Sequence, residues 1–126
     1  MGDSIAAAVA KTADAAGWLI LPADLPLVLP ATLLQVAAAL EQNQVVQPCL
    51  ERDGEVQKGH PVGFAAVCKE NLLNLKGNIG AAGVIIAYKA IKLIVNDIGI
   101  LTDIDTLHDL NRAETLLQSR YNQGRI

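Results

Sequence analysis

Residues 17–30 of the chain, GWLILPADLPLVLP, place a short apolar run in front of three prolines and one aspartate. A continuous apolar run such as Trp18–Leu21 is typical of a strand buried on both faces, and Pro22 stops it. Pro30 favours the first turn of a helix. A membrane span is excluded, because the prolines and Asp24 interrupt what would have to be about 20 unbroken apolar residues. The pattern therefore predicts a buried strand, a loop and a helix that faces the core.

The rest of the chain alternates helix and strand signals. Alanine-rich residues 4–15 predict a helix, and Thr106 with Asp109 forms a capping pair for a last helix over 107–121. Asp53-Gly54 is a strong turn signal within a polar loop. That loop is expected at 51–59, further helices at 67–76 and 79–90, and further strands at Val45–Val46, Val62–Ala66, 92–96 and 99–104. Strands that alternate with helices predict an α/β fold with a mixed, mainly parallel sheet.

The composition suits one domain and excludes several classes of function. Of the 126 residues, 52% are hydrophobic and 18% are charged, which provides a core and argues against a disordered chain. The net charge of −3 argues against a nucleic-acid surface, which needs clustered lysine and arginine. Cys49 and Cys68 have no zinc or redox spacing, and the first residues contain no basic leader. We therefore expect a cytoplasmic protein that binds neither nucleic acid nor a membrane.

Two segments lie where ligand-binding loops are expected, one directly after an apolar strand and the other directly before the capped last helix. Ligands of parallel α/β sheets bind beyond the carboxyl ends of the strands, which indicates Pro22–Pro26 and Asp103–Thr106. Asp24 offers oxygen ligands to a hard cation such as Mg²⁺, or alternatively is a turn aspartate that caps a nearby amide. Asp103 and Asp105 would share one face of a strand and repel unless a cation or a donor lay between them, or alternatively Asp105 or Thr106 simply caps the last helix.

His60 lies in the segment KGHPV, where a glycine permits close backbone approach and a proline stiffens the loop. A single histidine is a candidate for chemistry, but it is also commonly structural or solvated. The sequence offers no Ser/His/Asp order, no Cys/His pair and no metal-binding histidine pair. A glycine-rich phosphate loop of a recognised type is also absent from the sequence.

Five short motifs occur in one order along the chain. They are Met-Gly-x-Ser at 1–4, Leu-Pro-Ala-Asp-Leu-Pro at 21–26, Gly-His-Pro-Val at 59–62, Gly-x-x-Gly-Ala at 77–81 and Asp-Ile-Asp-Thr-x-x-Asp-Leu at 103–110. This order resembles the MobA-like nucleotidyltransferases, the family of molybdenum cofactor guanylyl- and cytidylyltransferases. The resemblance implies a three-layer α/β/α, Rossmann-like fold of the nucleotide-diphospho-sugar-transferase type. It also implies transfer of a nucleotidyl group from CTP or GTP to a phosphorylated acceptor such as molybdopterin, with Mg²⁺ neutralising phosphate charge.

The resemblance assigns roles to particular residues. Asp24 and Asp105 match the catalytic, metal-binding aspartates of the family. The residues that match substrate-binding positions are Pro22, Ala23, Gly59, His60 and Pro61.

The chain also departs from the family pattern. The family's first strand and its phosphate-binding loop have no counterpart, so the chain resembles the C-terminal two-thirds of such an enzyme and we expect residues 1–126 to form a single, incomplete domain. An acid and an arginine of a second glycine motif are replaced around Asn78. Apolar surface left uncovered usually marks an interface, so we expect a homo-oligomer formed through the exposed sheet. The alternative function is a non-catalytic assembly or interaction module.

Overall fold

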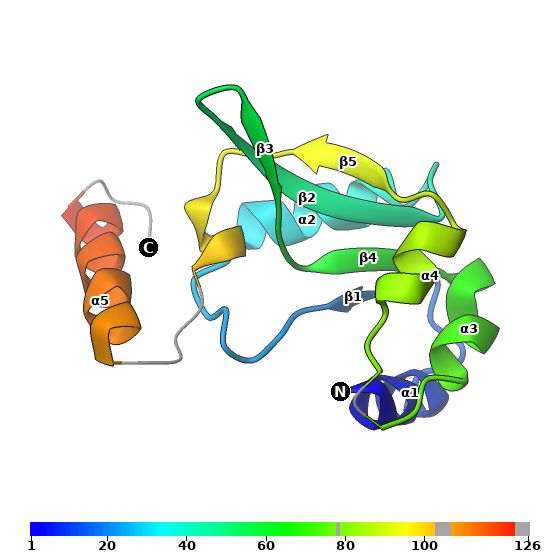
Figure 1. The fold of residues 1–126 in the computed structure, drawn as a ribbon. Coiled ribbons are helices and arrows are strands. Elements are labelled where there is room, and N and C mark those ends of the chain that lie inside the picture. The colour runs from blue at the N-terminus through cyan, green and yellow to red at the C-terminus, as the bar shows by residue number, and fades with distance from the viewer. Residues whose placement is uncertain (78, 103–106, 123–126) are drawn as a thin grey trace.

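The computed structural model describes residues 1–77, 79–102 and 107–122. Helices and strands alternate near the two ends of the chain, whereas in its middle three strands and then three helical segments follow one another (Figure 1). The helices are α1 (Gly2–Lys11), α2 (Pro30–Ala39), α3 (Lys69–Leu73), α4 (Ala82–Ala87) and α5 (Leu107–Asn122), with short 3₁₀ helices η1 (Ala66–Cys68) and η2 (Ile98–Leu101). The strands are β1 (Gly17–Ile20), β2 (Val45–Arg52), β3 (Glu55–Lys58), β4 (Val62–Ala65) and β5 (Ile91–Ile94).

The sheet is mixed, but its pairing is mainly antiparallel. β4 pairs with β1 and β2 in antiparallel fashion, β3 pairs antiparallel with β2, and only β5 pairs parallel with β2. The expectation of a mainly parallel sheet is therefore wrong for the described strands. The physical reason is a tight hairpin: Asp53 and Gly54 have φ angles of 52° and 80°, as the two central residues of a two-residue hairpin turn require. The segment expected as a polar loop at 51–59 is thus largely strand.

β3 and β4 act as two halves of one interrupted strand beside β2. Cys49 of β2 faces Lys58 of β3 and also Ile94 of β5, so β3 and β5 lie on opposite edges of β2. The same reasoning at Val46 places β4 opposite β5. β3 and β4 therefore share one edge of β2, and the break between them contains residues 59–61.

Helices cover both faces of the sheet and give three layers. α2 packs against β1, β2 and β4, and a Cβ on Gly63 of β4 would press on the side chains of Val36 and Leu40. Phe64, the next residue of β4, is fully buried on the opposite face in a cluster with Val9 of α1. Successive strand residues point to opposite faces, so α2 lies on one side and α1, α3 and α4 lie on the other (Figure 1). The predicted α/β/α layering is confirmed.

Several predicted boundaries shift. The helix expected at 79–90 is limited to Ala82–Ala87, and the helix expected at 67–76 is divided into η1 and α3. The strand expected at 99–104 is wrong where the structure describes it, because Ile98–Leu101 forms a 3₁₀ helix whose Gly99 amide is capped by the Asp97 side chain. The last helix agrees with prediction, while its expected cap Thr106 lies outside the described residues.

Two of the sequence motifs meet beside α1. The amide of Gly2 donates to the carbonyl oxygen of Gly77 at 2.9 Å, and a Cβ on Gly2 would overlap the carbonyl oxygen of Ile79. Gly2 of the first motif therefore allows close packing of two chain segments, whereas Gly77 of the fourth motif has a φ angle of 59°, which favours glycine. Within the part of the chain that the structure describes, no helix is long and apolar enough to cross a membrane.

Candidate active site

A hollow of about 360 Å³ brings together residues from four parts of the chain. Its walls come from the first residue, from the loop after β1, from the end of β3 with the following turn, and from η2. The lining residues are Met1, Pro22, Asp24, Leu25, Lys58, His60, Ile100 and Leu101. Asp24 and His60, selected from separate motifs, thus face one space.

Asp24 is a half-buried carboxylate in a turn. The amide of Leu25 donates to the carbonyl oxygen of Pro22 at 3.2 Å, so the backbone satisfies this turn without the Asp24 side chain. No hydrogen bond or ion pair to the Asp24 carboxylate is present among the described residues. The alternative role as a turn cap therefore finds no support. An unpartnered carboxylate beside an open hollow is the kind of oxygen ligand that a hard cation such as Mg²⁺ prefers.

The segment Gly59-His60-Pro61 forms the break between β3 and β4. The amide of Gly59 donates to the carbonyl oxygen of Pro48 at 2.8 Å, and the amide of His60 donates to that of Ile100 at 3.2 Å. A Cβ on Gly59 would lie 2.6 Å from the Ile100 carbonyl oxygen, so only glycine allows this approach. The peptide bond between His60 and Pro61 is cis. Gly59 and Pro61 are buried and do not line the hollow.

His60 presents its ring to the hollow from a half-buried position. Burial lowers the pKa of His60 below its ordinary value of 6.5, and the negative charge of Asp24 acts in the opposite direction. The ring nitrogen Nδ1 is buried and has no hydrogen-bond partner among the described residues. A charged imidazolium would require a partner for both ring N–H groups, so this site favours the neutral imidazole.

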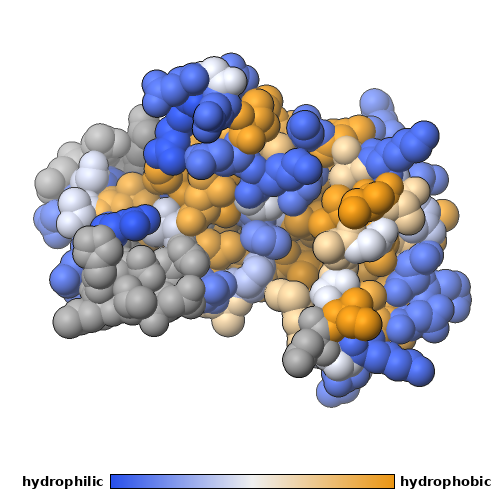
Figure 2. Space-filling model, viewed as in Figure 1, coloured by the Kyte–Doolittle hydropathy of each residue, from blue (hydrophilic) through white to orange (hydrophobic). Residues whose placement is uncertain are grey.

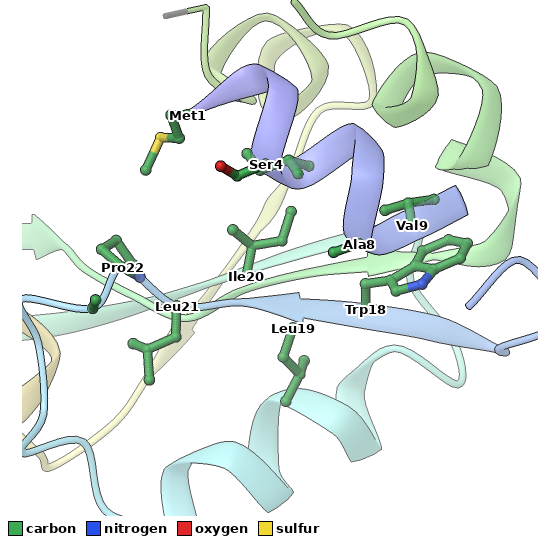
Figure 3. A pocket seen from close by; sticks show the side chains of 11 residues that line it. Met1, Ser4, Ala8, Val9, Trp18, Leu19, Ile20, Leu21 and Pro22 are labelled. Atoms are coloured by element: carbon green, nitrogen blue, oxygen red, sulfur yellow. The ribbon is translucent and has the colours of Figure 1, made fainter. Parts of the chain in front are cut away.

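A larger hollow of about 460 Å³ runs along β1 and is mainly apolar (Figure 3). Trp18 and Ile20 point from β1 toward α1, whereas Leu19 points to the other side of the strand. The lining of this larger hollow includes Ala23 but no ionisable side chain. This hollow shares Met1 and Pro22 with the smaller one, so the two are neighbours. The ionisable candidate residues therefore line the smaller hollow, and Ala23 lines the apolar one.

Sequence reasoning missed a buried polar centre next to the site. Asp97 is 3% exposed and forms an ion pair with Arg120 of α5, with 3.0 Å between Nη2 and Oδ1. An aspartate directly after the predicted strand 92–96 could have been selected by the rule that selected Asp24. Asp103 and Asp105, which were selected, lie outside the described residues.

A family model described as the MobA-like NTP transferase domain matches residues 1–91. The chain belongs to this family. The match spans β1, the Asp24 loop and the turn with His60, so both described site motifs of this MobA-like chain fall inside it.

The fold of this MobA-like chain is also similar to a solved structure. Rv0371c from Mycobacterium tuberculosis H37Rv matches with a TM-score of 0.74 and 23% sequence identity. The similarity covers 89% of this chain and 58% of that chain, so this chain spans little more than half the length of Rv0371c. At this identity the likeness supports the fold. No curated protein matches the sequence significantly.

Proposed function

We propose that this MobA-like chain is the acceptor-side part of a nucleotidyltransferase. The reaction transfers a nucleoside monophosphate from CTP or GTP to a phosphorylated acceptor such as molybdopterin. An acceptor phosphate oxygen bonds to the α-phosphorus, the bond between that phosphorus and the bridging oxygen breaks, and pyrophosphate leaves. The observation that supports this proposal is Asp24, a carboxylate beyond the carboxyl end of β1 that has no hydrogen-bond partner among the described residues and faces a hollow lined also by Lys58 and His60.

Asp24 and Asp105 are the residues that would hold Mg²⁺, Asp105 on the basis of its motif alone. A cation bound there would neutralise charge on the nucleotide phosphates. The donor chemistry of Asp24 fits this ion, because Mg²⁺ is commonly held by one or two carboxylates with substrate phosphates and water as its other ligands. Among the described residues, no group of three or more His, Cys, Asp or Glu side chains could hold a metal ion, so the nucleotide itself would supply most of the remaining ligands.

The other side of the hollow suits an anionic acceptor. Lys58 lines the hollow and brings a positive charge, and His60 adds a neutral imidazole that can hydrogen-bond a phosphate or a polar ring edge. Pro22 lines the same hollow beside Asp24. Gly59 and Pro61 contribute through the backbone, because they hold His60 in place.

The test compares Asp24→Ala with Asp14→Ala, a matched control in the exposed loop after α1. Calorimetric titration with Mg-CTP and Mg-GTP measures binding, and release of pyrophosphate in the presence of molybdopterin measures transfer. Loss of a direct metal ligand should weaken Mg-nucleotide binding by at least roughly tenfold, which is what outer-sphere partners alone typically cost. Asp14→Ala should bind as the wild type does. Equal binding and transfer by Asp24→Ala and the wild type would rule out this role for Asp24.

A second candidate function, as an assembly module, is supported by the free edge of β1. Among the described strands β1 pairs only with β4, and hollows of about 460 and 480 Å³ lie along it. Figure 2 shows that apolar surface is exposed on this face of the molecule, including beside the hydrophilic tip of the β2–β3 hairpin, which lies on the far side of the sheet from β1. A strand edge with unpaired amides and carbonyls flanked by apolar surface is a template for pairing with another chain. We propose that a second copy pairs there to form a homodimer.

Leu19 lines both hollows along β1, whereas Leu34 of α2 is 71% exposed and lines neither. Sedimentation analysis should therefore find a dimer for the wild type and for Leu34→Lys, and a monomer for Leu19→Lys. A wild-type monomer at all accessible concentrations would exclude the assembly function. Saturable binding of Mg-nucleotide would count against a purely structural role.

Both cysteines are free and buried, which supports the proposed cytoplasmic location.

A further inference from the structure

A single buried carboxylate, that of Asp97, accepts hydrogen bonds from the end of the Asp24 loop and from η2, and the next residue of η2, Ile100, supports His60 through its carbonyl oxygen. Its two oxygens accept four hydrogen bonds from three separate elements. We propose that Asp97 is a positioning residue, which sets Asp24 and His60 relative to one another across the hollow. This inference rests on the proposed function, because it assigns Asp97 to the same site.

The oxygen Oδ2 fixes the end of the loop that bears Asp24. It accepts from the amide of Leu29 at 2.9 Å and from the hydroxyl of Thr32 at 2.6 Å. Leu29 precedes the first residue of α2, so one carboxylate oxygen caps the helix that follows the Asp24 loop. The loop is therefore held by β1 at one end and by Asp97 at the other.

The oxygen Oδ1 fixes the support of His60. It accepts from the amide of Gly99 at 2.8 Å and so caps η2. The next residue of η2, Ile100, accepts the amide hydrogen of His60 through its carbonyl oxygen. The two segments also touch directly, because a Cβ on Gly99 would overlap the carbonyl oxygen of Leu27 in the Asp24 loop.

Arg120 of α5 balances the charge of this arrangement. Its Nη2 donates to Oδ1 of Asp97 at 3.0 Å and its Nη1 donates to the carbonyl oxygen of Leu27 at 2.6 Å. The same guanidinium therefore holds both Asp97 and the Asp24 loop. Figure 1 shows that α5 lies at the opposite end of the molecule from α1 and α3, so this contact reaches the site from a separate element.

The geometry separates this role from direct participation in chemistry. A carboxylate has about four lone-pair positions, and all of them are used by the four donors around Asp97. The side chain of Asp97 is 1% exposed and does not line the hollow of Asp24 and His60. Asp97 has no free position for a metal or a substrate, so its influence must pass through the segments it binds.

The test uses Thr32, whose replacement removes one donor and leaves the other three. Thr32→Val is close in shape and lacks the hydroxyl, whereas Thr32→Ser keeps the hydroxyl and is the conservative rescue. Amide hydrogen exchange is followed by NMR at Leu25 and His60, one in each segment. Loss of a buried hydrogen bond to a charged acceptor should raise exchange at both amides by roughly tenfold or more.

A general loss of stability must give a different pattern. Ala65 donates to the carbonyl oxygen of Gln44 at 2.8 Å, outside the Asp97 network, and should keep its exchange rate in Thr32→Val. Leu72→Ala is the matched control, because Leu72 is fully buried in the core cluster that contains Phe64 and Val9. Its loss should not raise amide exchange at Leu25 and His60 more than elsewhere. Thr32→Ser should restore wild-type rates at both amides.

The same variants are titrated with Mg-CTP and Mg-GTP. Weaker binding by Thr32→Val, restored in Thr32→Ser, would support the positioning role. Faster exchange at only one of the two segments, or an equal rise at Ala65, would overturn it. If the wild type binds neither nucleotide, the proposed function is overturned, and the exchange rates still decide whether Asp97 couples the two segments.

Discussion

Replacing Gly59 by alanine tests the packing that presents His60 to the hollow. The new Cβ would lie 2.6 Å from the carbonyl oxygen of Ile100 and 2.8 Å from its Cβ. Both atoms belong to or adjoin the backbone, so rotation of a side chain cannot relieve the overlap. Gly59 cannot retreat either, because its amide is bonded to the carbonyl oxygen of Pro48 at 2.8 Å.

Overpacking of this kind typically costs about 1–3 kcal/mol. We expect Gly59→Ala to lie in the upper part of that range, since both sides of the contact are fixed. Urea unfolding followed by the fluorescence of Trp18, the only tryptophan of the chain, measures the free energy of unfolding. Nucleotide titration of the same variant then shows whether displacement of His60 affects the site.

The matched control is Gly83→Ala. Gly83 is exposed on α4 and nothing lies within 4 Å of the position of an added Cβ. Alanine is favoured over glycine in a helix, so this variant should be unchanged or more stable by up to about 1 kcal/mol. If Gly59→Ala unfolds at the same urea concentration as the wild type, Ile100 does not pack against Gly59 and the account of the turn is refuted.

Other perturbations have outcomes that the structure also predicts. Because burial lowers the pKa of His60 from 6.5, the unfolded chain binds this proton at a higher pH than the folded chain does. The stability that His60 contributes is therefore full above pH 6.5 and is lost as the pH falls from 6.5 through the pKa of the folded state. In His60→Gln, the urea concentration at half-unfolding should depend less on pH over this range than it does in the wild type. Arg120→Met leaves the Asp97 carboxylate without its ion-pair partner and should lower the free energy of unfolding in urea by about 3 kcal/mol. A variant as stable as the wild type would contradict this. Leu72→Ala should cost about 2–5 kcal/mol, and a smaller loss would show that the cluster around Phe64 repacks.

Local signals were sufficient for several elements. The apolar run before Pro22 is β1, Pro30 is the first residue of α2, and the last helix occupies the predicted span. These elements depend on side chains within a few positions of one another, so a short window of sequence contains the cause. Asp53-Gly54 was recognised as a turn for the same reason.

The pairing of strands could not be predicted in this way. Glu51 and Arg52 are polar and were assigned to a loop, but they pair with β3 because the hairpin turn brings the two segments together. Ile98–Leu101 is as apolar as a strand and forms a 3₁₀ helix instead, because Asp97 caps it and α5 supplies Arg120 to Asp97. In both cases the deciding partner lies in another segment.

In the candidate site, too, some features follow from local sequence and others from contacts between distant segments. The motifs selected Asp24 and His60 separately, and Pro22 with them, and all three line one hollow. Gly59 and Pro61, from the same motif as His60, are buried in the turn and hold the backbone. Asp97 escaped sequence reasoning because its importance comes from donors that are distant in the chain.

The sequence by itself determined the α/β class, the buried first strand, the family resemblance and the candidate residues Asp24 and His60. It could do so because propensity, capping and motif spacing act over short distances along the chain. Only the tertiary structure decided that pairing is mainly antiparallel, that the two candidates share a hollow, and that Asp97 couples their segments. Such contacts are set by the packing of the chain around β2 and η2, where a buried polar group such as the Asp97 carboxylate is partnered by donors that are distant in the sequence.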